Sequence, residues 1–150
     1  MTIAPIDITH KVLVTPLVVE RVKSLNSNFS LLIDELLHFF ADTYRDLFHF
    51  EHPPLHDPIA VAFAIEPSIF TDQRLVRVQV ETGDSVCKGR TDIDIFKMSK
   101  KKPNVNVLMD LNIEKFWDLM LVALTKADKH SPLNHPSRER KIKEIEIELK

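Results

Sequence analysis

The sequence has 150 residues, of which 44% are hydrophobic and 28% charged, and its formal net charge is −2 at pH 7. This composition is typical of one ordinary globular domain, and the absence of a basic field argues against a nucleic-acid partner. The single cysteine, Cys87, excludes an internal disulfide framework, and we expect it to be inert in a reducing compartment. No apolar run is long enough to span a bilayer and no signal-peptide pattern is present, so we expect no membrane partner and a cytoplasmic location.

The first third of the chain is predicted to form one strand and two helices. Residues Thr2 to Ile8 are predicted to be an extended strand. A helix is expected from Pro16 to Val22, with Thr15 as its N-terminal cap. From Phe29 to about Phe48, apolar residues recur with the helical spacing i, i+3, i+4, which predicts the longest helix of the chain.

The most informative stretch is His56-Asp57-Pro58, which follows two prolines and precedes the apolar run Ile59 to Ile65. Asp57 is expected to be a helix N-cap, with Pro58 as the first helical residue. Because the run is apolar on every side, the helix is predicted to be buried. This would place the His56 imidazole beside a carboxylate at the positive end of a helix, facing an open cleft. The simpler alternative is that Asp57 is only a cap and His56 only a loop residue.

The rest of the chain is predicted to contain a β-hairpin or meander and one more helix. Strands are expected at Leu75 to Val80, Arg90 to Ile95 and Asn104 to Leu108, and the only two glycines, Gly83 and Gly89, lie in the turn that joins the first two.

A helix from Asn112 to Ala127 follows, for which Asp110 is the expected cap. Residues 129–136 are predicted to be loop, and the charged tail from Arg138 to Lys150 a solvated or frayed end. Lys100 to Lys102 are interpreted as a solvated loop charge run.

Four patches stand out in order along the chain: Pro5 to Pro16, Pro54 to Ala62, Val80 to Thr91, and Asn104 to Leu108 with Phe116 to Leu119. Together they resemble the inosine–uridine nucleoside N-ribohydrolases. The resemblance extends from Thr2 to about Ala127 and predicts an α/β class, the C-terminal portion of a nucleoside-hydrolase-like, Rossmann-like fold with a small β-hairpin and flanking helices. The matching domain is expected at residues 1–128, with residues 129–150 as loop and tail.

The resemblance implies hydrolysis of the N-glycosidic bond of purine or pyrimidine ribonucleosides, a reaction of nucleoside catabolism. It also implies roles for two residues: His56 would assist the departing base, and Asp57 would be a ligand of Ca²⁺. Imidazolium is a suitable acid for a poor leaving group, and a hard cation can orient ribose hydroxyls. Family members are commonly oligomers, so a homo-oligomer or a complementary subunit is the expected protein partner, beside the nucleoside substrate.

The chain departs from the family pattern where most of the metal ligands belong. The N-terminal cluster of the type Asp-x-Asp-x-x-x-Asp-Asp is absent, and so is the segment whose asparagine and glutamate contact the ribose. Two hypotheses follow. The chain is the C-terminal part of a nucleoside hydrolase, whether a truncated isoform, a fragment or an incomplete gene product, with little or no activity expected alone, or it is a non-catalytic remnant or assembly module that keeps the family's packing surfaces. An unrelated α+β domain with a chance His-Asp-Pro is a third. His10 is interpreted as a structural polar group, with a role at the pocket as the alternative.

Overall fold

The computed structural model describes residues 1–135 of the chain, which form two compact units. Of the described residues, the first unit contains Met1–Val12 and Pro54–Phe116, and the second contains Leu13–Pro53 and residues 117–135. The tail predicted from Arg138 to Lys150 lies outside the described residues.

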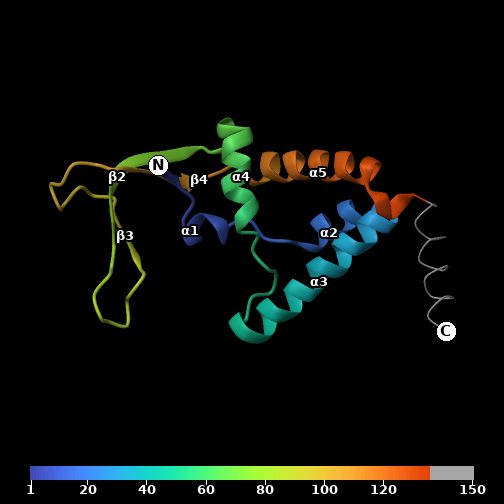
Figure 1. Ribbon diagram of the computed structural model, residues 1–150, viewed down its shortest axis with the longest axis horizontal. Helices are drawn as coiled ribbons and strands as arrows, with labels where there is room; N and C mark the ends of the chain where they lie inside the picture. Colours follow the sequence, from blue (N-terminus) through green and yellow to red (C-terminus); the bar gives the residue numbers. More distant parts are fainter. Residues whose placement is uncertain (136–150) are drawn as a thin grey trace. The chain divides into compact units, whose positions relative to one another are not determined.

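The first unit is built on a four-stranded sheet with the order β1-β4-β2-β3 (Figure 1). Strand β1 is parallel to β4, whereas β2 is antiparallel to both β4 and β3. Of the two predicted alternatives, the hairpin of β2 and β3 is therefore confirmed, but the three strands are not a meander, because β4 pairs with β2 and not with β3. Alternating valines of β2 and β4 form the core, because successive side chains of a strand point to opposite faces. The strands are β1 (Thr2–Ile3), β2 (Asp72–Val80), β3 (Thr91–Asp94) and β4 (Val105–Asp110). This valine cluster comprises Val76, Val78, Val105 and Val107, and further side chains of the unit, such as Ile59 and Phe116, are also fully buried.

The strand predicted over Thr2 to Ile8 is wrong beyond Ile3. Residues Ile6–Thr9 form the helical turn α1, which begins after Pro5. Proline has no N–H to donate to a sheet ladder, so the pairing of β1 with β4 stops before it. The Pro5 carbonyl instead accepts hydrogen bonds from the N–H groups of Ile8 and Thr9, and this turn buries both of their side chains.

The apolar helix after the two prolines is α4 (Asp57–Ile65), and its expected complete burial is wrong. Ile59 is fully buried, but Val61 is 57% exposed on the opposite side of the same helix. The N-cap is His56, one residue earlier than expected, because its carbonyl accepts the first helical hydrogen bond from Ile59. Asp57 is therefore the first helical residue, and the side chain of the N-cap residue His56 makes no capping hydrogen bond.

The last helix, α5 (Ile113–His130), is capped by Asn112 and not by Asp110 as predicted. The Asn112 side chain accepts a hydrogen bond of 2.9 Å from the N–H of Lys115. Asp110 is the last residue of β4, where its carbonyl bonds the N–H of Thr71. The helix also extends beyond Ala127, the end predicted for it.

The second unit is helical. It contains α2 (Pro16–Lys23), α3 (Asn28–Phe48), the part of α5 from Trp117 and the short turn η2 (Pro132–Asn134). Figure 1 shows α2 in blue lying along α3 in cyan. Ser27 caps α3 through a reciprocal capping box with Ser30, and Arg21 of α2 pairs with Asp118 of α5 at 2.9 Å. Among the described helices of both units, none is long and apolar enough to cross a membrane.

Candidate active site

The His-Asp-Pro motif lies where a fixed loop enters α4. Pro53 and Pro54 are buried, and the N–H of Leu55 donates a hydrogen bond of 2.9 Å to the carbonyl of Val12. A residue that precedes proline is kept out of the helical region, so the approach stays extended until the motif is reached. His56 is half-buried at this helix start, and Asp57 is exposed.

His56 is held by a residue that sequence analysis did not select. Its Nδ1 lies 2.8 Å from the Oγ1 hydroxyl of Thr9, which is only 4% exposed. The same hydroxyl lies 3.2 Å from the carbonyl of Ile6, one turn earlier in α1. The sequence contained one signal for this contact, the Thr-His pair of the first family-like patch, but the fold alone brings residues 47 positions apart together.

A second histidine accompanies this contact. The ring centroid of His10 lies 5.4 Å from that of His56, with the two planes tilted by 56°. Burial lowers the pKa of His56 below its ordinary value, and the positive charge of a protonated His10 lowers it further. The neighbouring carboxylate of Asp57 has the opposite, smaller effect. The neutral imidazole is therefore the favoured form of His56 at neutral pH.

The described residues do not by themselves fit a calcium ion. Ca²⁺ takes about six to eight oxygen ligands, several of them carboxylates. Within residues 1–135, no group of three or more histidine, cysteine, aspartate or glutamate side chains is arranged to hold a metal. Asp57 offers one exposed carboxylate, so any calcium site that includes it needs ligands from elsewhere.

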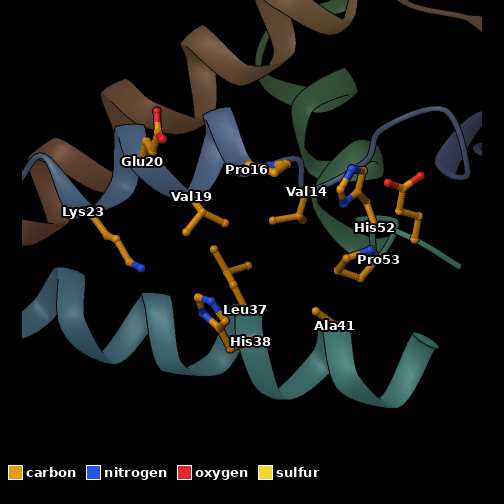
Figure 2. A pocket seen from close by; sticks show the side chains of 11 residues that line it. Val14, Pro16, Val19, Glu20, Lys23, Leu37, His38, Ala41, His52 and Pro53 are labelled. Carbon is orange, nitrogen blue, oxygen red and sulfur yellow. The ribbon is translucent and has the colours of Figure 1, made fainter. Parts of the chain in front are cut away.

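A cavity of the second unit lies between α2 and α3 and has a volume of about 330 Å³ (Figure 2). Figure 2 shows Val19 of α2 and Leu37 of α3 pointing toward each other across it, with Lys23 and His38 near its edge. Both polar side chains also contact Asp34, with Lys23 Nζ at 3.3 Å and His38 Nδ1 at 3.2 Å from its carboxylate oxygens. The ion pair between Lys23 and Asp34 therefore also helps to hold α2 and α3 together.

The first unit has a larger groove of about 960 Å³, formed by α1, the β2–β3 hairpin and the end of β4. Its lining includes Arg77, whose Nε is buried without a hydrogen-bond partner. A further cavity of the second unit lies at the start of α3, beside Ser27, Asn28 and Leu31. His56 lines neither the groove of the first unit nor either cavity of the second. The open cleft expected beside His56 is thus not among these three cavities.

Comparison with known proteins identifies the family. Residues 1–118 match the model of the inosine-uridine preferring nucleoside hydrolases. The chain is 45% identical over 132 residues to a probable ribonucleoside hydrolase of Dictyostelium discoideum, covering 84% of this chain and 38% of that protein. It is 32% identical over 126 residues to the inosine-uridine preferring nucleoside hydrolase of Crithidia fasciculata, covering 84% and 40%.

The structure shows the same relationship. A plant nucleoside hydrolase, the PpNRh1 enzyme, superposes with a TM-score of 0.69 at 27% identity, covering 83% of this chain and 41% of that one. A purine-preferring ribonucleoside hydrolase from Gardnerella vaginalis shares the fold, with a TM-score of 0.72, 22% identity and coverage of 87% and 41%.

A mixed α/β chain with these matches is of the nucleoside-hydrolase class, and the predicted fold is confirmed. The chain belongs to the inosine-uridine preferring nucleoside hydrolase family, and it spans about 40% of the length of the relatives that it matches.

Proposed function

We propose that this chain supplies the histidine-bearing part of a site that hydrolyses the N-glycosidic bond of ribonucleosides. The observation that carries the proposal is the family match over residues 1–118, which includes His56-Asp57-Pro58 at the start of α4. In the reaction, the bond between the ribose carbon and the base nitrogen breaks, and water adds its hydroxyl to the carbon. The base takes up one proton as it leaves, and the remaining proton of the water replaces it, so that the products are ribose and the free base.

His56 is the residue of the described chain that is suited to give the base this proton. The protonated ring, imidazolium, can donate a proton to the departing nitrogen, and the neutral imidazole that remains can then recover a proton from the attacking water. Its position at the start of α4 and its contact with Thr9 support this role, because a proton donor must be held in one orientation. Asp57 is proposed to contribute one carboxylate to a calcium site completed by groups outside the described residues.

The chain alone is expected to release little or no free base from inosine or uridine. A calcium titration of the purified chain, followed by calorimetry, tests the same point: one carboxylate gives weak binding, whereas a complete site gives tight binding with one ion per chain. Rapid, calcium-dependent base release by the isolated chain would contradict this expectation and show that the chain itself holds the remaining calcium ligands and the ribose contacts.

A chimera tests the function directly. The matching segment of the Crithidia fasciculata relative would be replaced by residues 1–135 of this chain, and release of free base from inosine would be measured. We expect activity in the chimera, a large loss of kcat in His56→Ala, and no loss in the control His130→Ala, an exposed histidine at the end of α5. A chimera that folds and binds calcium but releases no base would favour the alternative function, a non-catalytic assembly module.

A further inference from the structure

The contact between Thr9 and His56 shows where the hydroxyl hydrogen of Thr9 points and which ring nitrogen of His56 carries a hydrogen. A threonine hydroxyl has one hydrogen, and its oxygen can also accept hydrogen bonds. The Ile6 carbonyl, 3.2 Å from Thr9 Oγ1, can only accept. If the hydroxyl hydrogen pointed to His56 Nδ1, the Oγ1 and Ile6 oxygens would face each other with no hydrogen between them.

One arrangement satisfies both contacts. The hydroxyl of Thr9 donates to the Ile6 carbonyl, as threonines in helices commonly do to a carbonyl one turn earlier. Its oxygen then accepts from His56, so Nδ1 must carry the hydrogen across the 2.8 Å contact. The neutral imidazole that results has its lone pair on Nε2.

We propose that Thr9 is a positioning residue that fixes His56 in the Nδ1–H tautomer and makes Nε2 the nitrogen that exchanges a proton with the nucleoside base. The catalytic meaning of this assignment rests on the function proposed above, but the hydrogen bond does not. The same arrangement also serves the protonated ring, because imidazolium keeps its Nδ1–H and gains a hydrogen at Nε2.

Two features make Thr9 suited to this task. Its side chain is 4% exposed, so water does not compete effectively for the hydroxyl. It belongs to α1, whose N–H and carbonyl groups are tied by hydrogen bonds between Pro5 and Ile8 and between Ile6 and His10. The hydrogen bonds of α1 therefore hold the Thr9 hydroxyl in position independently of its contact with His56.

The test is nitrogen NMR on the 150-residue chain with ¹⁵N-labelled histidine, at a pH where His56 is neutral. A ring nitrogen that carries hydrogen resonates far upfield of one that carries a lone pair, so the two tautomers differ. His38 and His130 are internal references, because their Nδ1 atoms face the carbonyls of Asp34 and Lys126 at 2.9 and 2.8 Å and must donate. We expect His56 Nδ1 to resonate with these references.

Three variants separate positioning from mere packing. Thr9→Val removes the hydroxyl at nearly constant shape and should shift His56 toward the Nε2–H tautomer, whereas Thr9→Ser should retain the wild-type signals. The control Thr125→Val removes a hydroxyl that bonds the Leu121 carbonyl in α5 and should leave His56 unchanged. A lone pair on Nδ1 in the wild-type chain, or unchanged His56 signals in folded Thr9→Val, would overturn the proposal. Since no substrate is used, these outcomes are independent of the chimera's activity.

Discussion

Lys11 Nζ lies 3.0 Å from Asp110 Oδ1, so an ion pair connects the turn after α1 to the last residue of β4. The ammonium group also donates to the carbonyl of Met109 at 3.2 Å. Asp110 was predicted to be a helix cap, and the structure gives its carboxylate this different task. Both side chains are about half exposed, so the pair contributes only modestly to stability.

The contribution of Asp110 should depend on pH. The hydrogen bond from Lys11, then that from the N–H of Leu111, lowers the pKa of the Asp110 carboxyl below its ordinary value of 3.8. A lowered pKa in the folded state stabilises the fold above the unfolded pKa, and the gain is lost as pH falls through the folded value. Asp110→Asn should therefore be less stable than wild type at pH 7 and nearly equal at pH 2 in urea unfolding. An equal difference at both pH values would contradict this explanation.

The two sides of α4 should respond differently to truncation. Ile59 has no exposed surface, so Ile59→Ala should lower the free energy of unfolding by about 2–5 kcal/mol through lost burial and the cavity left behind. Val61→Ala, on the exposed side, should change it by less than about 0.5 kcal/mol. Urea unfolding measures both variants. A large loss in Val61→Ala would mean that this side is covered in solution, as the apolar pattern had predicted.

The two glycines of the hairpin turn should also differ. Gly89 has φ +88°, a left-handed conformation that costs about 1–2 kcal/mol for a residue with a Cβ, so Gly89→Ala should destabilise by that amount. A Cβ on Gly83 would lie 2.7 Å from Glu81 Oε1, the end of a flexible side chain that can move away. Gly83→Ala should therefore change stability by less than about 0.5 kcal/mol. Equal thermal shifts in the two variants would argue against the backbone explanation.

Elements whose signals are local were predicted well. Pro16 and the spacing of apolar residues after Phe29 located α2 and α3, and the period-two alternation from Leu75 to Val80 located β2. These signals are local: proline acts through its own backbone, and the spacing of apolar residues within one segment shows which of its faces is buried. The helical turn at Ile6–Thr9 was missed because its β-branched residues favour a strand. Pro5 has no N–H to donate to the sheet, so it ends the strand in spite of that composition.

The candidate site was only partly accessible to prediction. His56 and Asp57 were recognised because they are adjacent in a short motif. Thr9 was not, because its contact with His56 joins two segments that meet only in the folded unit. Burial of α4 was overestimated for a related reason. The apolar run of Ile59 to Ile65 shows that the helix could be buried on every side, but it does not show which other residues of the fold pack against it.

The last prediction concerns an apolar face of α3. Its large side chains recur at helical spacing and are 41–68% exposed, which is unusual for a stable monomer. This face comprises Leu32, Leu36, Phe39, Phe40 and Leu47. We expect the isolated chain to self-associate through it at micromolar concentration, because burying such a face removes apolar surface from water.

Sedimentation velocity across a concentration series measures this association. The double variant Leu36→Gln with Phe40→Gln should reduce it without unfolding the chain, since both side chains are exposed and glutamine is a good helix former. The control Glu35→Gln places the same side chain, glutamine, at an exposed position of the same helix without removing an apolar group, so it should associate as wild type does. If the wild-type chain is a monomer that unfolds cooperatively, or if the double variant associates as strongly as wild type, this face is not the contact surface.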